Sequence, residues 1–509
     1  MPPARMKESE EQEERHGVMK TKTLLCVLSG ACAATALAWD CPTIKPGVPL
    51  IFPDNTQIAS KTNTTRCIHA GVKDADPVLR KDRPWEDKGA VVYGSVWKMD
   101  DGSYRMWYCD WSWSNVADSK DGKVWTKPAL TVRPTKECPT NNMCNGAWGH
   151  CNSLIYDRFE KDPARRFKHM GCGYKYNPDW SINKEVTGYY SCVSGDGINF
   201  KDYKRALYGW DTSSLAQHPE TGEIFCYHKI NTPGYAGRDD RRRVVFVSRT
   251  TDFEHWTPPE LALAPDRIDD ESFTENPNQR MDIYTHTAFP YAGGFIGFLT
   301  AFRIDHRNTS SHGETADQGF CDVQMATSTD GIAWHRTPGR KTVLTRGVDG
   351  RWDSGGIWGM AGGEVVSNEK ESMLYYYGWD SAHGRPVKPG MPQYGTLRAT
   401  GRAVWRRWGF ASIGSTGAGS FTTKPVKFAT ADLRINMRPE FDPYQGKCAL
   451  TVKILSNDGK RILCESEKLE KDDTLAKLVW KGGRKLPVNA PVRIRVDYHS
   501  ASIFAFECL

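Results

Sequence analysis

A short turn motif occurs four times in the chain and limits its possible folds more than any other feature. The copies are Ser119-Lys-Asp-Gly-Lys-Val-Trp125, Ser194-Gly-Asp-Gly-Ile-Asn-Phe200, Thr250-Thr-Asp-Phe-Glu-His-Trp256 and Ser328-Thr-Asp-Gly-Ile-Ala-Trp334. Asp-Gly favours a tight hairpin turn, and the Ser or Thr hydroxyl can bond to the backbone of that turn. We expect the aromatic side chain that ends each copy to pack beneath the next repeat.

Alternating apolar strands accompany the motifs, for example at Arg105–Tyr108, Phe225–Tyr227, Phe295–Leu299 and Met373–Tyr377. Strand-rich units of about 55 to 80 residues that repeat around one core are typical of a β-propeller. Candidate inner strands at 90–99, 150–156, 212–217, 283–290 and 354–366 predict five blades. The fifth lacks the motif, although 395–405 can supply its outer strands. A parallel β-helix is the alternative, but its repeats are much shorter.

The pattern changes after about residue 417, where strands continue without the motif. They are expected at 433–436, 448–455, 461–464, 492–496 and 503–506. We therefore predict an all-β chain, a five-bladed β-propeller followed by a small C-terminal β-sandwich. The predicted divisions are an N-terminal leader and signal peptide at 1–38, the propeller at 39–416 and the sandwich at 417–509.

The N-terminus resembles a secretion signal. Lys20 and Lys22 precede an apolar stretch, Thr23–Leu37, and Ala36-Leu37-Ala38 supplies the small residues of a cleavage site. We expect cleavage after Ala38, a secreted protein and no membrane span in the mature chain. Either Met19 is the true start or the acidic leader before it is tolerated, and an uncleaved segment would instead be a membrane anchor.

The chain has 15 cysteines, of which Cys26 and Cys32 fall within the predicted signal. In an oxidising compartment most of the others are expected to form disulfides. The spacing of Cys138, Cys144 and Cys151 fits no familiar zinc pattern, so disulfides are favoured there too. Asn63 and Asn308 begin glycosylation sequons. No cofactor or metal is predicted.

Net charge and composition limit the classes of molecule that the chain is expected to bind. A net charge of +7 without a basic run argues against nucleic acid. Aromatic residues make up 11% of the chain, with 18 Trp. Flat aromatic rings serve carbohydrate sites, but packed β cores also use Trp, so composition alone does not decide.

Carboxylates recur where the predicted inner strands begin. The entries are Trp85-Glu86, Trp148-Gly-His150, Trp210-Asp211, Met281-Asp282 and Trp352-Asp353, and 71 residues separate Asp211 from Asp282 and Asp282 from Asp353. Such residues can cap turns or join blades. Four together at one axis would repel one another, which is tolerated where chemistry needs it.

Glycoside hydrolysis is a reaction that needs paired carboxylates, one as acid and one as nucleophile or base. We therefore predict Asp211, Asp282, Glu86 and Asp353 as catalytic residues. The predicted substrate-binding residues are His150, Trp85, Trp210, Tyr284, His286 and Trp352. Packing between blades is the alternative role for the three Trp residues.

The repeated hairpins followed by further β-strands resemble the five-bladed glycoside hydrolases of families 32, 43 and 68. The chain is most similar to family-32-like secreted proteins of uncharacterised activity. Val91–Ser95, Asp162–Lys168, Phe253–Glu260 and Trp480–Val496 carry the resemblance, which covers roughly residues 70–509.

The chain departs from the family-32 signatures. Asp76-Pro77 lacks the flanking Asn and Gly, Asp162-Pro163 lies beside a turn, and the pairs Glu137-Cys138 and Glu507-Cys508 are not at the entry of the third blade. The resemblance therefore implies the architecture, without fructose specificity or an assignment of nucleophile and acid.

The predicted function is a secreted glycoside hydrolase acting on furanosides or related glycans, with an oligo- or polysaccharide as its partner. The alternative is a carbohydrate-binding or adhesion propeller without catalysis. A sialidase is the third possibility, because the hairpins resemble the sialidase Asp-box. Their spacing differs, however, and no Arg recurs at the blade entries.

Overall fold

The computed structural model describes residues 41–86, 88–110, 113–173, 175, 177–178, 183–232, 242–271, 279–306, 317–384, 397–444 and 446–509. All of them belong to one compact unit, Ala38–Leu509. The predicted signal peptide, Cys26, Cys32 and Asn308 lie outside the described residues. In the described part of the chain, no helix has the length and apolar character needed to cross a membrane.

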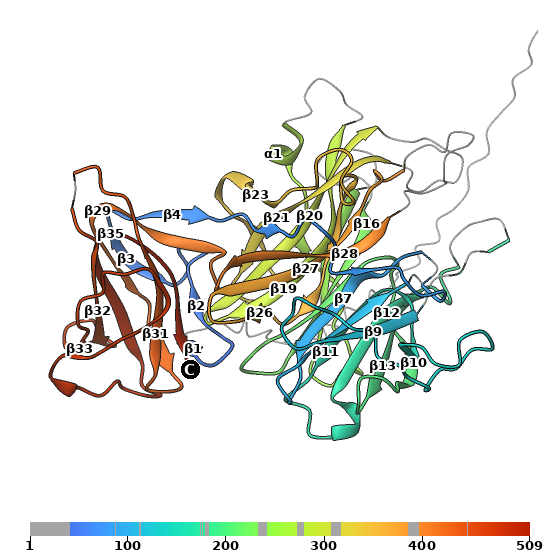
Figure 1. Ribbon diagram of the computed structural model, residues 1–509, viewed down its shortest axis with the longest axis horizontal. Helices are drawn as coiled ribbons and strands as arrows, with labels where there is room; N and C mark the ends of the chain where they lie inside the picture. Colours follow the sequence, from blue (N-terminus) through green and yellow to red (C-terminus); the bar gives the residue numbers. More distant parts are fainter. Residues whose placement is uncertain are drawn as a thin grey trace, which may run out of the picture. The chain divides into compact units, whose positions relative to one another are not determined.

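Five antiparallel sheets form the blades of a propeller (Figure 1). Blade 1 contains β7 (Val91–Lys98), β8 (Tyr104–Cys109), β9 (Trp113–Ser119) and β10 (Met143–Trp148). Blade 2 contains β11 (His150–Tyr156), β12 (Phe167–Gly173), β13 (Gly188–Ser194) and β14 (Lys201–Leu207). Blade 3 contains β15 (Ser213–Gln217), β16 (Ile224–Thr232), β17 (Arg242–Thr250) and β18 (Glu260–Leu263).

Blades 4 and 5 are less regular. Blade 4 contains β19 (Arg280–Tyr291), β20 (Gly294–His306), β21 (Gln318–Ser328), β22 (His335–Arg336) and β23 (Thr342–Leu344), and the single-turn helix α1 (Arg267–Asp270) precedes it. Blade 5 contains β24 (Gly356–Met360), β26 (Val366–Ser367), β27 (Glu371–Trp379) and β28 (Arg398–Arg406). The strand β25 (Gly362–Gly363) runs parallel to β7.

The propeller closes on itself. The five inner strands contact one another in the ring β7, β11, β15, β19, β24 and back to β7. Two short N-terminal strands, β5 (Val72–Lys73) and β6 (Leu79–Arg80), pair with β28 and complete blade 5. The five-bladed, all-β architecture predicted from the repeat is therefore confirmed.

The hairpin motifs have the predicted turn but a different packing direction. In the first copy, Ser119 Oγ accepts from the Gly122 backbone N at 2.9 Å, and Asp121 Oδ1 accepts from two backbone N–H groups at 2.8 and 3.0 Å. The terminal Trp125 packs edge-on against Tyr375 of blade 5, with ring centroids 5.3 Å apart. The aromatic residue thus contacts the preceding blade, which corrects the expectation that it would lie beneath the next one.

A second recurring bond joins neighbouring blades. An aromatic side chain on the second strand of one blade donates to the carbonyl of the motif glycine in the following blade. The three examples are Trp107 to Gly197 at 2.7 Å, Tyr227 to Gly331 at 2.7 Å and Tyr375 to Gly122 at 2.5 Å. The motif therefore forms the turn and also presents a hydrogen-bond acceptor to the neighbouring blade.

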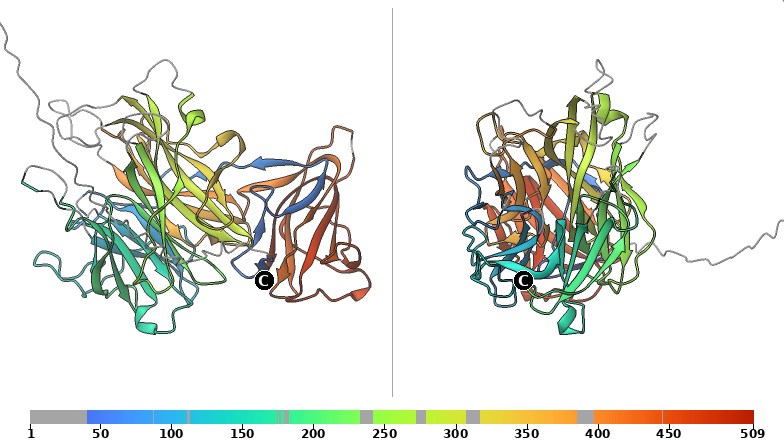
Figure 2. Two further views of the ribbon diagram at one scale, coloured as in Figure 1. Left: turned by 180° about the vertical axis from the view of Figure 1, so that it is seen from behind. Right: turned by 90° about the vertical axis from the view of Figure 1, so that its right-hand side faces the viewer.

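The C-terminal strands form a separate nine-stranded sheet with help from the N-terminus. It contains β2 (Leu50–Ile51), β3 (Ile58–Thr62), β4 (Thr65–Ile68), β29 (Ala411–Thr423), β31 (Leu433–Pro439), β32 (Ala449–Ser456), β33 (Ile462–Glu465), β34 (Asp473–Lys477) and β35 (Val492–Cys508). Two further short strands, β1 (Thr43–Ile44) and β30 (Lys427–Phe428), pair with each other in parallel. Figure 2 shows the blue N-terminal strands among the orange and red ones. The predicted division at 416/417, which remains a prediction, falls inside β29.

The cysteines do not form the predicted disulfides. All 13 described cysteines are free thiols, and nine of them are buried, including Cys144 and Cys151. Burial raises the pKa of the Cys151 thiol well above its usual value, so this group stays protonated and poorly reactive. The expectation failed because pairing depends on contacts between distant strands, and these side chains are used as small apolar core residues.

Candidate functional site

A repeated glycine opens four of the five inner strands and defines the axial ring. Gly89, Gly149, Gly209 and Gly356 have φ values between 126° and 147°, which favour glycine. Two residues after each lie Val91, Cys151, Asp211 and Trp358. Val91, Cys151 and Trp358 belong to one buried cluster with Tyr284 of blade 4, and Asp211 contacts Cys151. One carboxylate therefore faces this ring of otherwise apolar and aromatic residues.

The four predicted carboxylates have different bonded partners. Glu86 is fully buried and accepts from the backbone N of Asp82 and Arg83 at 3.0 and 3.1 Å. It also accepts from Tyr108 Oη at 2.6 Å and pairs with Lys127 at 2.6 Å. These bonds fix the loop that leads into blade 1.

Asp282 is enclosed by three arginines. Its carboxylate lies 2.9 Å from Arg243, 3.1 Å from Arg280 and 3.4 Å from Arg242, and it is fully buried. Burial raises its pKa, but the three guanidinium groups outweigh burial and hold the pKa below its usual value. Three arginines therefore surround one carboxylate, but their guanidinium groups already pair with Asp282, Asp270 and Asp317.

Asp353 joins the ends of blade 5. It is 3% exposed, forms an ion pair with Lys73 of β5 and accepts from Tyr376 Oη at 3.1 Å. Because Lys73 lies on a strand that closes the ring, this pair fastens the closure. The 71-residue interval therefore connects carboxylates with different surroundings.

Asp211 is the predicted carboxylate that reaches solvent at the axis. Its side chain is 24% exposed and forms an ion pair with Lys229 of β16. His150 Nε2 lies 3.4 Å from Oδ1, and the Cys151 thiol lies 3.7 Å from the same oxygen. Burial raises the pKa of Asp211, but Lys229 and His150 lower it far more, so the carboxylate is ionised at neutral pH. We call Asp211, His150, Cys151 and Lys229 the axial site.

Two of the nine described non-glycine residues with positive φ lie in the axial site. Asp211 has φ of 77° and Cys151 has φ of 52°, both in the left-handed region that non-glycine residues rarely adopt. Such a conformation costs roughly 1–2 kcal/mol for a residue with a β-carbon. The two strained residues contact each other across blades 2 and 3. Strain retained at adjacent residues is typical of functional sites.

Aromatic rings surround the axial site. The Lys229 ammonium lies 4.7 Å from the centroid of the Tyr284 ring, and Tyr93 packs edge-on against His150 at 5.7 Å. Tyr284 in turn contacts Trp358 at 5.3 Å and His383 at 5.7 Å. Lys229 is only 4% exposed, so Asp211 and these rings hold its charge in place.

The donor set also resembles a metal site in one respect. Ligand atoms of His150, Cys151 and Asp211 lie within 4.8 Å of one another. A cation there would compete with the Lys229 ammonium, which already pairs with Asp211. Burial also keeps the Cys151 thiol protonated, and a metal ligand must be the thiolate. These residues therefore do not fit a resident metal ion.

The other predicted binding residues occupy packing positions. His286 is 3% exposed and contacts Tyr227 and Trp334, and burial lowers its pKa to about 3. Trp85 donates to Asn142 at 2.8 Å, and Trp352 stacks on Tyr376 at 5.7 Å. Trp210 lies at the Asp211 turn, where its carbonyl accepts from Tyr189 Oη at 2.9 Å. All three Trp side chains are partly exposed.

Sequence reasoning missed Lys229 and Cys151. Lys229 lies in an alternating strand and carries no motif that distinguishes it from a surface lysine. The glycine two residues before each ring position was a usable signal, because Gly89, Gly149, Gly209 and Gly356 repeat with blade periodicity. When the blades are aligned on these glycines, Asp211 is the one of the four predicted carboxylates that falls at a ring position.

No family model matches the chain, and no curated protein matches it. One similar solved structure is a thermostable family-43 glycoside hydrolase, with 12% identity over 61% of this chain and 87% of that chain and a TM-score of 0.38. A family-32 glycoside hydrolase from Bifidobacterium adolescentis has 10% identity over 86% and 81%, with a TM-score of 0.35. An N-acetylgalactosamine deacetylase from F. plautii has 12% identity over 72% and 94%, with a TM-score of 0.37.

The chain is thus similar to solved glycoside hydrolases of families 32 and 43, as its motifs predicted. Two of these three proteins are glycoside hydrolases and the third is a deacetylase, and the identities and TM-scores are low. The similarity therefore says nothing about this chain's own reaction, and the five-bladed fold rests on its own sheets.

Proposed function

We propose that this chain is a secreted glycoside hydrolase that cleaves O-glycosidic bonds of furanosides or related glycans at the axial site. One observation carries the proposal: Asp211 is an ionised, partly exposed carboxylate held in a strained backbone conformation. The predicted signal peptide and the cleavage point after Ala38 support secretion.

The lowered pKa of Asp211 defines its role. A carboxylate ionised at neutral pH attacks the anomeric carbon or activates water, whereas the acid that protonates the leaving oxygen must hold its proton. Asp211 therefore serves as nucleophile or base. His150 Nε2 lies 3.4 Å from the Asp211 carboxylate, where its ring can hydrogen-bond the substrate, and Lys229 balances the charge.

Glu86, Asp282 and Asp353 take positioning roles in this proposal. Each is at most 3% exposed and forms ion pairs that hold a blade entry or the ring closure. None of the three shares a bonded partner with Asp211 among the described contacts.

A carbohydrate-binding propeller without catalysis is the second candidate. The ion pairs that occupy Glu86, Asp282 and Asp353 favour it, since a pair of available carboxylates is the usual requirement for hydrolysis. In that case Asp211 and His150 would bind sugar hydroxyl groups.

The test uses the mature full-length chain against p-nitrophenyl α-L-arabinofuranoside, arabino-oligosaccharides and inulin-type fructo-oligosaccharides. Asp211→Asn should lower turnover about 10³-fold. Asn tolerates the left-handed conformation, so the backbone is preserved. The matched control is Asp121→Asn in a hairpin, which should keep normal turnover. Binding of these glycans without hydrolysis by the wild type would favour the second candidate, and an active Asp211→Asn variant would overturn Asp211's role.

A further inference from the structure

An exposed tryptophan closely precedes the axial residue His150 in the sequence. Trp148 ends β10, two residues before His150, and 37% of its surface is exposed. Its ring is nearly parallel to those of Tyr203 and Tyr190, at 5.5 Å and 25° and at 6.2 Å and 27°. The two tyrosines stack on each other at 4.9 Å and 7°. We call these three rings the blade 2 platform.

The platform is rigid. Its rings come from three different strands, β10, β13 and β14, and Tyr190 Oη donates to the Val186 carbonyl at 2.7 Å. Gly173 of β12 borders it, since a β-carbon there would lie 3.0 Å from the Trp148 ring and 3.2 Å from Tyr190. The two tyrosines pack against the indole, and 37% of Trp148 nevertheless remains exposed.

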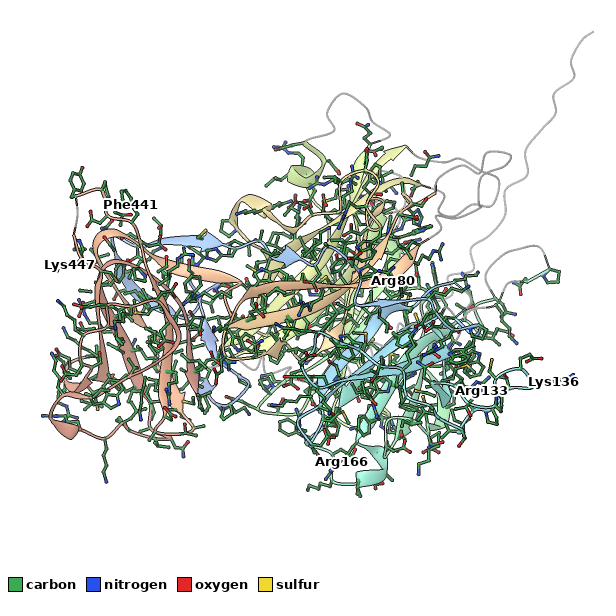
Figure 3. All side chains as sticks on the ribbon, viewed as in Figure 1. Arg80, Arg133, Lys136, Arg166, Phe441 and Lys447 are labelled. Atoms are coloured by element: carbon green, nitrogen blue, oxygen red, sulfur yellow. The ribbon has the colours of Figure 1, made fainter. Side chains whose placement is uncertain are left out.

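Trp113, the neighbour of Trp148 on the adjacent strand, has its ring covered by another side chain. Trp113 pairs with Trp148 across β9 and β10, and the Arg133 guanidinium lies 3.2 Å from its ring centroid. Arg133, which is labelled in Figure 3, belongs to the connection between β9 and β10. Arg133 therefore covers the ring of Trp113, while Trp148 keeps an open indole surface.

The platform lies outward from the axis. The sheet order β11, β12, β13, β14 places Tyr203 three strands away from the strand that carries His150. Strands are about 4.8 Å apart, so this separation is roughly 14 Å. A sugar ring bound at Asp211 would not reach Tyr203, but a later residue of the same glycan chain could reach the platform.

We propose that the blade 2 platform binds a sugar ring of an oligo- or polysaccharide beyond the bond that is cleaved, with Trp148 as the stacking residue. A rigid aromatic face loses little entropy on binding and matches the apolar face of a sugar ring. This inference rests on the proposed function and adds to it that the substrate is a chain that runs over blade 2, and that single-residue glycosides are poorer substrates.

The test compares wild type, Trp148→Ala, Trp148→Phe and the control Phe159→Ala. Phe159 is 46% exposed and follows β11 at the strand end opposite His150. Trp148→Ala should raise KM for arabinohexaose or fructohexaose about ten-fold. The kinetics of p-nitrophenyl α-L-arabinofuranoside should be unchanged, and Trp148→Phe should lie between Ala and wild type. Thermal unfolding of each variant verifies its fold.

Calorimetric titration of the Asp211→Asn variant with the same hexaoses separates this inference from the proposed function. Binding that Trp148→Ala weakens, in a wild-type chain that hydrolyses nothing, would support the platform and overturn the hydrolase. Hydrolysis whose chain-length dependence Trp148→Ala leaves unchanged would overturn the platform and keep the hydrolase. If the hexaoses neither bind nor react, both are overturned.

Discussion

The outer hairpins and the inner axial ring of this propeller repeat in opposite ways. At the hairpins, the same Ser or Thr and the same Asp recur, and their bonds agree closely. Asp196, Asp252 and Asp330 each accept from two backbone N–H groups at 2.7 to 2.9 Å. At the ring, the five positions hold Val91, Cys151, Asp211, Tyr284 and Trp358, and each is different.

The difference separates what a blade needs from what a site needs. A hairpin must turn and present an acceptor to its neighbour, and the same residue types do this in blades 1, 2 and 4. The ring positions share a backbone frame, since four follow a glycine of positive φ, but their side chains are free to differ. Because the side chains differ, an ionised carboxylate stands at the ring position of blade 3 and at none of the other four ring positions.

Gly209→Ala should break the shared backbone frame. A β-carbon there would lie 2.5 Å from the buried Tyr189 ring, and φ is 147°. Tyr189 Oη donates to the carbonyls of Trp210 and Thr212, so its displacement would move Asp211. We expect the free energy of unfolding to fall by about 3 kcal/mol and turnover to fall with it.

The control for Gly209→Ala is Gly102→Ala in a hairpin, where φ is 85° and no atom lies within 4 Å of the β-carbon position. It should lose about 1 kcal/mol and keep full turnover. Urea unfolding and kinetics measure both variants. Equal losses would show that the axial frame is no tighter than a surface turn.

Lys229→Met removes the cation that pairs with the carboxylate at the ring position of blade 3. The variant leaves the partly exposed Asp211 carboxylate without its ion pair, which we expect to cost about 2 kcal/mol at pH 7. In the wild type the folded-state pKa of Asp211 lies below its unfolded value. Its contribution to stability is present above the unfolded pKa and is lost as pH falls through the folded pKa.

Without Lys229 the pKa of Asp211 rises, so the acid limb of the pH–rate profile should move to higher pH. The acid-induced fall in the free energy of unfolding should move the same way. Arg105→Met, which removes the ion pair with Asp118 in blade 1, is the control and should leave the acid limb in place. An unmoved acid limb in Lys229→Met would mean that another group controls the charge of Asp211.

The sequence allowed the hairpins to be predicted better than the axis, for a physical reason. A turn depends on residues at fixed local offsets, as in Ser119 to Trp125, and a regular repeat of turns predicts the number of blades. Ring closure by β5 and the pairing of β3 with β29 join residues hundreds of positions apart, and no local pattern encodes them. Likewise, Asp353 and Asp211 look equivalent in the sequence, but the Asp353 side chain is 4% exposed and its lysine, Lys73, lies on the strand that closes the ring.

Asp121→Ala tests the hairpin side of the comparison and should have the smallest effect. The variant removes the carboxylate that accepts from the backbone N–H groups of Lys123 and Val124. These bonds lower the pKa of Asp121, so its stabilising effect is present above pH 4 and is lost as pH falls through the folded-state pKa. We expect a loss of about 1 kcal/mol at pH 7, a smaller loss at pH 3, and unchanged kcat. Urea unfolding at both pH values measures this. A change in kcat as large as that of Asp211→Asn would mean that the hairpins are part of the catalytic apparatus, and the division between structural repeat and functional ring would no longer hold.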